Sequence, residues 1–150
     1  MQIKNSKAFH DYTILEKFEL GIVLNGCEVK SIRDGRASIK NAHLSYKDPH
    51  IMIMNMHIDS WYKSDAVKYD TTRPRIMLLR KNEKNKMIAA LKLAGQTIVP
   101  LELFWNKKGM AKLVCAIVVG KTNYDKRASI KEREFKRTKE ILFKNRKLGA

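Results

Sequence analysis

The segment TIVPLELFWNKKGMAKLVCAIVVG, residues 97–120, decides the fold, because it contains two apolar runs separated by a short polar turn. In each run, apolar residues recur at every second position, the period of a β-strand with one buried face. Pro100 cannot donate a ladder hydrogen bond, so it indicates a sheet edge or a bulge. We therefore expect two strands joined by a turn at 106–109. Their expected apolar faces consist of Val99, Leu101, Leu103 and Trp105, and of Leu113, Cys115, Ile117 and Val119.

Four further strands are expected upstream of this segment. Apolar residues alternate at even positions from Tyr12 to Leu24, although Glu16 interrupts the apolar face. Two strands flank residues 47–49, and in the second we expect the even positions from Met52 to Ile58 to share a face. The apolar run at 75–79 predicts one more. Six short strands separated by turns favour a small closed barrel, because closure leaves no exposed strand edge.

Two helices are predicted between the strands. Asn25 and Glu28 have the spacing of a capping box and predict a helix over about 26–33. Asn82 is expected to cap a second helix that Gly95 ends.

Two segments show no regular pattern. The first ten residues are polar and basic, which predicts a loosely held start. Residues 59–74 lack periodicity, which predicts an exposed loop. Large or basic side chains that we expect this loop to expose are Trp61, Tyr62, Lys63, Lys68 and Arg73.

The charge balance points to a polyanionic partner. The 150 residues include 31 Lys and Arg against 15 Asp and Glu, a formal net charge of +16. Nucleic acid is the usual polyanion for such a protein. A membrane-binding basic helix would need a broad apolar face, and a bilayer span a much longer apolar run than any found here. The N-terminus has no apolar signal-peptide core, and the two cysteines fit reduced thiols, so we expect a cytoplasmic protein.

The last thirty residues, 121–150, are the most basic part of the chain. They contain seven Lys, four Arg and four acidic residues, and no proline. This composition has helical propensity but lacks an apolar stripe that would hold a helix against a core. We therefore expect a tail that is disordered in isolation and becomes helical on a partner. The alternative is a solvated helix docked on the barrel.

Motifs for catalysis or cofactor binding are not found in the sequence. His43, His50 and His57 are spaced by seven, but they lie in strand-like segments and share no face, which disfavours a metal site. No glycine-rich phosphate loop or nucleophile motif occurs. Cys27 and Cys115 have no metal-ligand spacing. The carboxylates early in the chain fit a solvated strand face better than an acid–base pair. The sequence thus predicts a binding protein, not an enzyme, without metal or cofactor.

Four ordered blocks of sequence match one family. The first two lie in the segment that begins at Asn5 and includes KAFHDYTILEKFELGIVLNGCEVKSIRDGRASIKNAHL, residues 7–44. The third is GQTIVPLELFW, residues 95–105, and the fourth is VGKTNYDKRASIKERE, residues 119–134. Through these blocks the chain resembles the SsrA-binding protein (small protein B) family, from about residue 5 to residue 137.

The resemblance implies a fold and a function. The implied fold is a six-stranded antiparallel barrel related to the OB fold, at residues 1–120, with short flanking helices and a basic tail at 121–150. The implied function is trans-translation, in which the protein binds transfer-messenger RNA and delivers it to stalled ribosomes. The barrel would bind the tRNA-like domain, and the tail would occupy the empty message channel near the decoding centre. The free protein is expected to be a monomer. From composition alone, a structural ribosomal or general RNA-binding OB-fold protein is the alternative.

The resemblance also assigns site residues. Expected contacts to transfer-messenger RNA are Asn5, His10, Glu19, Leu78 and Lys112. Expected tail residues for the ribosomal decoding centre are Gly120, Lys121, Tyr124, Asp125, Lys126, Arg127, Lys131 and Arg133. Without the resemblance, Glu19 would be a solvent-facing carboxylate, Leu78 a core residue and Lys112 one more surface lysine.

Overall fold

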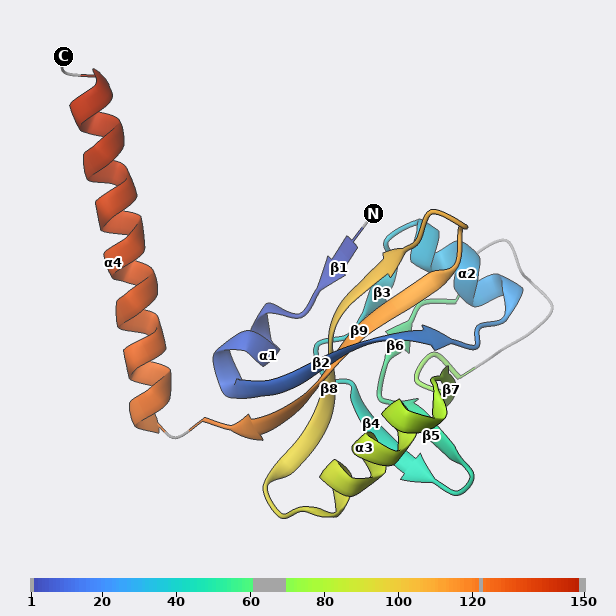
Figure 1. The fold of residues 1–150 in the computed structure, drawn as a ribbon. Coiled ribbons are helices and arrows are strands. Elements are labelled where there is room, and N and C mark those ends of the chain that lie inside the picture. Colours follow the sequence, from blue (N-terminus) through green and yellow to red (C-terminus); the bar gives the residue numbers. More distant parts are fainter. Residues whose placement is uncertain (1, 61–69, 122, 149–150) are drawn as a thin grey trace. The chain divides into compact units, whose positions relative to one another are not determined.

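The computed structural model describes residues 2–60, 70–121 and 123–148, and of the last range it describes side chains only at 131–142 and 144. The chain divides into two compact units, a body at Met1–Gly120 and a tail at Lys121–Ala150 (Figure 1). None of the described helices is both long and apolar enough to cross a membrane.

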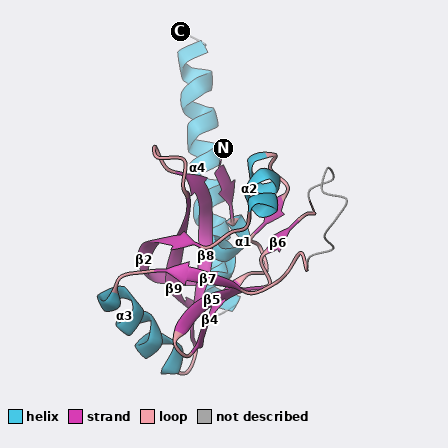
Figure 2. Ribbon diagram, turned by 90° about the vertical axis from the view of Figure 1, so that its right-hand side faces the viewer, coloured by secondary structure: helices cyan, strands magenta, loops and turns pink. Residues whose placement is uncertain are grey.

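The body is mainly β, built on a large antiparallel sheet with short helices (Figure 2). Seven strands form the sheet in the order β1-β8-β9-β2-β7-β5-β4, and two more form a small separate pair, β3-β6. β4 at the sheet edge also contacts β8, so the sheet curls back on itself. Strand bounds are β1 Gln2–Lys4, β2 Tyr12–Ile22, β3 Ala37–Ser38, β4 His43–Lys47, β5 His50–Met54, β6 His57–Ile58, β7 Arg75–Leu78, β8 Gln96–Trp105 and β9 Ala111–Gly120.

The six predicted strands correspond to β2, β4, β5, β7, β8 and β9. The count missed β1 and β3, which have three and two residues, and it merged the two-residue β6 with β5. Strands this short carry no readable alternation and exist because a partner strand accepts them. The prediction of a loosely held start is therefore wrong: Ile3 of β1 pairs with Leu103 of β8, and Asn5 is buried.

Three helices belong to the body, α1 Ser6–Asp11, α2 Gly26–Arg33 and α3 Lys81–Lys92, and α4 Asn123–Leu148 forms the tail. The predicted capping box of α2 is confirmed, with Asn25 and Glu28 exchanging hydrogen bonds of 2.9 and 3.1 Å. Asn82 does not cap α3. The cap is Arg80, two residues earlier, and the Glu83 carboxylate accepts a 3.0 Å hydrogen bond from its backbone N–H.

Apolar side chains are buried on both faces of the β8-β9-β2 part of the sheet. The inner face contributes to the main core, together with Ile53, Met77 and Met87 from other elements. The outer face carries a smaller cluster, in which Val99 and Ala116 pack with Ala8 of α1. β9 alternates regularly between these faces, as predicted for its inner residues Leu113, Cys115 and Ile117.

Two bulges correct the predicted faces of β2 and β8. The register of β2 shifts between Ile14 and Glu16, so Ile14 packs in the outer cluster and Phe18 in the inner core. The register of β8 shifts between Pro100 and Glu102, as the proline indicated. Val99 is therefore an outer residue and Leu103 an inner one, although both were expected on one face. An extra residue reverses the parity of all side chains beyond it.

The faces expected for residues 52–58 are also wrong. Ile51 and Ile53 are buried in β5, while Met56 and Ile58 are buried beyond it. Asn55 interrupts the strand with a φ of 58°, in the left-handed region, and parity changes there. Of the expected loop at 59–74, Trp61, Tyr62, Lys63 and Lys68 lie outside the described residues.

Candidate nucleic-acid interface

A row of three residues crosses three neighbouring strands on the outer face of the body. Gly21 of β2 lies directly opposite Lys112 of β9 and also opposite Leu78 of β7. Residues opposite one another in an antiparallel pair project from the same face. Glu19 follows two positions along β2 from Gly21 and therefore shares this face. Three residues predicted separately as RNA contacts, Glu19, Leu78 and Lys112, are thus brought together by strand register.

Gly21 allows this row to pack closely. A Cβ at this position would lie 3.1 Å from the Cβ of Leu78, tighter than most real contacts. The absence of a side chain lets Leu78 lie over the backbone of β2. Leu78 nevertheless remains 53% exposed, so the interpretation of this residue as core is excluded. An exposed leucine held between polar side chains is suited to contact the apolar face of a base.

Hollows of different chemistry lie on the two sides of Leu78. The polar one has a volume of about 540 Å³, and Glu19, Arg80, Glu83 and Lys112 line it. We call it the polar groove. Lys112 makes no ion pair with any described residue, so its charge is available to a phosphate. The Glu19 carboxylate can accept hydrogen bonds from base amino groups.

The second hollow is more apolar and has a volume of about 240 Å³. Leu24, Val29, Trp105 and Met110 line it, and it shares Gly21, Leu78 and Lys112 with the polar groove. The Arg33 guanidinium lies 5.2 Å from the centre of the Trp105 ring, a cation–π distance. Sequence reasoning did not single out Arg80, Trp105 and Met110, because only the fold brings β7 and the residues after it beside the β8–β9 hairpin.

A buried charge cluster holds β7 in place beside α2. Glu28 and Arg75 are both fully buried, and the Arg75 Nε–H donates to the Glu28 carboxylate. Arg73 donates to the other carboxylate oxygen. Arg75 also donates to the Met56 carbonyl at 2.7 Å and to the Thr71 carbonyl at 3.1 Å. These bonds hold the first residue of β7, and thereby help to fix the position of Leu78 at the end of the same strand.

Asn5 does not lie on an open surface. Its side chain is 1% exposed. Its Nδ2 donates to the carbonyls of Ile39 at 3.2 Å and Pro100 at 2.9 Å, and its Oδ1 accepts from the Ala8 N–H at 3.2 Å. Both amide hydrogens are therefore used within the protein. His10 is half-buried on α1, where its Nδ1 lies 3.0 Å from Oδ1 of Asp11. Neither residue lines the polar groove.

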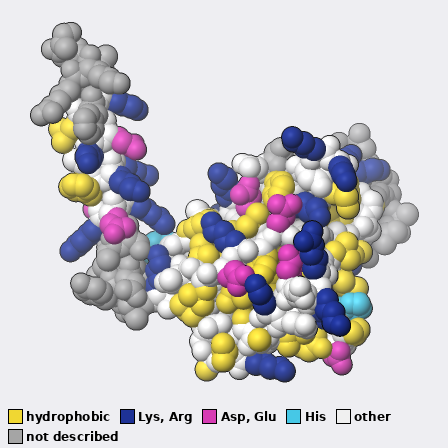
Figure 3. All heavy atoms as spheres, viewed as in Figure 1, with side chains coloured by type: hydrophobic (Ala, Val, Ile, Leu, Met, Phe, Trp, Pro, Cys, Tyr) yellow, Lys and Arg dark blue, Asp and Glu magenta, His cyan; other side chains and the backbone are white. Residues whose placement is uncertain are grey.

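The predicted tail residues extend from the end of β9 into α4. Gly120 ends β9 and Lys121 follows it. Lys131 and Arg133 are exposed on α4. The side chains of Tyr124, Asp125, Lys126 and Arg127 lie outside the described residues. Figure 3 shows Lys and Arg side chains at many points along the described part of α4, and separately over the drawn face of the body.

These features define a small, strongly basic, mainly β protein with a preformed groove and a charged helical arm. A family model described as SmpB protein matches residues 2–145. The chain belongs to the SmpB family.

Curated relatives are similar in sequence over nearly the whole chain. An SsrA-binding protein from Wolbachia sp. subsp. Brugia malayi (strain TRS) is 46% identical over 142 residues, 95% of either chain. One from Rickettsia bellii (strain OSU 85-389) is 41% identical over 143 residues, again 95% of either chain. A solved structure described as "tmRNA-SmpB: a journey to the center of the bacterial ribosome" superimposes with a TM-score of 0.69 at 34% identity, covering 81% of this chain and 85% of the other.

Proposed function

We propose that this protein binds transfer-messenger RNA and delivers it to stalled ribosomes in trans-translation. It acts as a binding factor and not as an enzyme, in the cytoplasm, and as a monomer when free. Family membership and the SsrA-binding name of its relatives support the proposal. The observation that carries it is the row Lys112–Gly21–Leu78 with Glu19 beside it, because register assembles three separately predicted contact residues into one surface.

The body contacts the tRNA-like domain of the RNA through this surface. Lys112 neutralises a phosphate, Glu19 accepts hydrogen bonds from base edges, and Leu78 packs on a base. The six long strands act as a barrel of the OB type, a reading supported by the contact of β4 with β8. Ligands of OB folds bind across the strands, and the row Lys112–Gly21–Leu78 also crosses the strands.

The tail occupies the empty message channel near the decoding centre. Lys131 and Arg133 neutralise ribosomal phosphates, together with the basic residues of the segment 121–127. We propose that α4 is disordered in the free protein and helical on the ribosome, since a solvated helix without a partner is marginal.

A salt-controlled gel shift tests the proposal. The probe is the tRNA-like domain of transfer-messenger RNA, and an ordinary tRNA is the competitor. We expect binding that survives physiological salt and an excess of tRNA. Lys112→Ala and Glu19→Ala should each weaken it by about ten- to a hundredfold, the range of one good charged or base-reading contact.

The matched control is Lys47→Ala, which removes an exposed lysine at the hairpin between β4 and β5. It should leave affinity within about twofold, since Lys47 lines neither of the two hollows beside Leu78. Equal binding of both RNAs that collapses with salt would leave only a general basic protein and refute the proposal. Stoichiometric retention on ribosomal subunits in high salt would favour a structural ribosomal protein instead.

A further inference from the structure

The row Lys112–Gly21–Leu78 continues across two more strands. Phe104 of β8 lies directly opposite Lys112, and Gln2 of β1 lies directly opposite Phe104. Residues opposite one another in antiparallel strands project from the same face, so five strands contribute one residue each to a single line. We call this line the extended row; its members are Gln2, Phe104, Lys112, Gly21 and Leu78. Four strand spacings of about 4.8 Å make it roughly 19 Å long.

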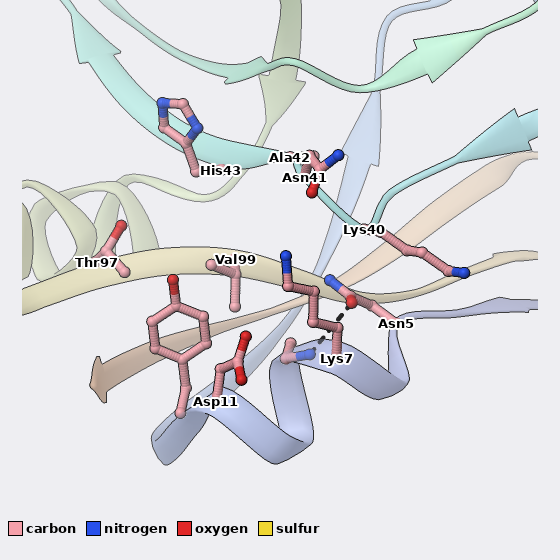
Figure 4. A pocket seen from close by; sticks show the side chains of 11 residues that line it. Asn5, Lys7, Asp11, Lys40, Asn41, Ala42, His43, Thr97 and Val99 are labelled. Atoms are coloured by element: carbon pink, nitrogen blue, oxygen red, sulfur yellow. Dashed lines mark hydrogen bonds between the residues drawn. The ribbon is translucent and has the colours of Figure 1, made fainter. Parts of the chain in front are cut away.

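The extended row crosses the part of the outer face that α1 does not cover. Ala8 of α1 packs with Val99 and Ala116 in the outer cluster, and Figure 4 shows Val99 projecting from β8 toward α1. Phe104 lies five residues beyond Val99, toward the β8–β9 turn. Gln2 and Leu78 are exposed and Phe104 and Lys112 half-buried, so a ligand can reach the row from end to end.

The half-buried position of Phe104 is not explained by core packing. Among the described residues, Phe104 belongs to neither of the two apolar clusters, whereas its neighbours Leu103 and Trp105 pack with the main core. Its ring lies next to Lys112, since side chains directly opposite in a sheet have Cβ atoms about 5 Å apart. An aromatic ring beside a cation is the combination by which single-stranded nucleic acid is bound, the ring taking a base and the cation a phosphate.

The charge around Phe104 favours a polyanion as the occupant of this surface. No residue of the extended row is acidic. Lys107 and Lys108, in the turn that follows β8, are both exposed. At the far end of the row, Gln2 adds a neutral amide that can donate and accept hydrogen bonds.

We propose that Phe104 stacks on an unpaired base of the RNA and that Gln2 hydrogen-bonds beside it, so that the interface extends from Leu78 to β1. The inference deepens the proposed function and rests on it, because that function supplies the RNA. Stacking on a ring requires an unstacked base, so the segment bound here is a loop and not a helical stem. Pairing with β8 gives β1 a part in binding, because it carries Gln2 to the end of the row.

Gel shifts with the tRNA-like domain at several salt concentrations test the proposal. Phe104→Leu keeps an apolar side chain without a ring and should weaken binding by about tenfold, in the range of one stacked base. The slope of log K against log salt should not change, because stacking releases no counterions, whereas Lys112→Ala should reduce it by about 1. Phe104→Tyr keeps the ring and should bind within about twofold of the wild type. The matched control is Tyr46→Leu, which removes an exposed ring from β4, outside the row, and should bind like the wild type.

Gln2→Ala tests the same surface without disturbing the fold, because this side chain is exposed. It should weaken binding by about threefold, the effect of one hydrogen bond, again with an unchanged salt slope. Wild-type affinity in Phe104→Leu would overturn the proposal. So would a loss in Phe104→Leu that accompanies a lower melting temperature while Gln2→Ala binds normally, since Phe104 would then be structural.

Failure of this inference can be told apart from failure of the proposed function. If the wild type does not distinguish the tRNA-like domain from an ordinary tRNA, the proposed function fails. If it does distinguish them and Phe104→Leu binds like the wild type, only the extension of the interface to β8 and β1 fails.

Discussion

The body and the tail use their apolar side chains in opposite ways. In the body, residues such as Leu20, Ile53 and Leu113 are completely buried in one core. On α4, the described apolar side chains Phe135, Ile141 and Leu142 are 58–71% exposed. A core stabilises its elements without a ligand, whereas an isolated helix of one chain is at best marginal in water.

Under the proposed function, this difference predicts two modes of RNA recognition in one protein. The polar groove is held by strand register and buried hydrogen bonds, so it exists before RNA arrives. Every described side chain of α4 is exposed, and none of these packs into a core. Its order is therefore expected to come from the partner, at an entropic cost that lowers affinity while permitting a long contact. Truncation and substitution of either part test this difference between the body and the tail.

Removal of residues 121–150 should have the largest effect. The remaining body should keep its free energy of unfolding within about 0.5 kcal/mol, because no core residue is lost. It should bind the tRNA-like domain within a fewfold of the full chain, while tagging of incomplete proteins falls to background. A reconstituted translation reaction on a message without a stop codon measures this. A variant whose tail has the same composition in scrambled order separates the effect of charge from that of sequence. Tagging by the truncated chain would show that the tail is not needed for function.

Arg75→Met should produce the next largest effect. It leaves the Glu28 carboxylate fully buried with one partner fewer, and breaking a buried ion pair costs about 3–5 kcal/mol. Urea unfolding followed by circular dichroism measures the loss. The matched variant is Arg133→Met on exposed α4, expected within about 0.5 kcal/mol of the wild type. Equal losses in the free energy of unfolding for the two variants would mean that the body and the tail do not differ in packing.

The sequence predicted most of the elements but not which face each residue takes. Period-two alternation and short apolar runs located β2, β4, β5, β7, β8 and β9, and the capping box located α2. Alternation cannot reveal where an extra residue reverses parity, as near Leu15 in β2 and Leu101 in β8. Nor can it reveal β1, since three residues form a strand only because β8 offers an edge. These features depend on contacts distant in sequence.

The sequence named residues of the candidate interface one at a time, but it did not show that they form one surface. Sequence motifs supplied Glu19, Leu78 and Lys112 separately, from three different strands. Their neighbourhood depends on register, and so does the role of Arg80 beside them. The burial of Asn5 could not be predicted either, because the carbonyls that its side chain binds lie 34 and 95 residues away in the sequence.

Asn5→Ala should lower the free energy of unfolding by about 2–3 kcal/mol, since a helix cap is lost and two buried carbonyls lose a donor. Thermal unfolding of the 1–120 body measures this, once that fragment is shown to fold. Lys112→Ala is the comparison, because it should weaken RNA binding and leave stability unchanged. An unchanged free energy of unfolding for Asn5→Ala would mean that the hydrogen bonds of Asn5 contribute little to stability.

Gly21→Ala should have a smaller effect on stability, about 1 kcal/mol, because the new Cβ must displace Leu78 by a few tenths of an ångström. The displaced leucine should weaken RNA binding severalfold. Gly26→Ala is the control, since a Cβ there meets nothing within 4 Å. Gel shifts on both variants provide the measurement, and an unchanged affinity for Gly21→Ala would exclude Leu78 as a base contact.

The smallest effect is expected at Cys115, whose thiol reports whether the body opens. Burial raises the pKa of the Cys115 thiol well above its usual range, so the reactive thiolate is suppressed in the folded protein. The unfolded chain loses this proton first, so stability should fall as pH rises past about 8.5. At pH 8, a thiol reagent should label half-buried Cys27 readily and Cys115 only when the body opens.

The rate of Cys115 labelling should be the same in the full chain and in the 1–120 body. The core that buries Cys115 is formed by residues of the body alone. Opening of the body is therefore expected to set the labelling rate with or without the tail. Cys27→Ser isolates the Cys115 signal, and mass spectrometry counts the modified thiols. Faster labelling after truncation would show that the tail stabilises the body, and the contrast between a self-sufficient body and a dependent tail would have to be withdrawn.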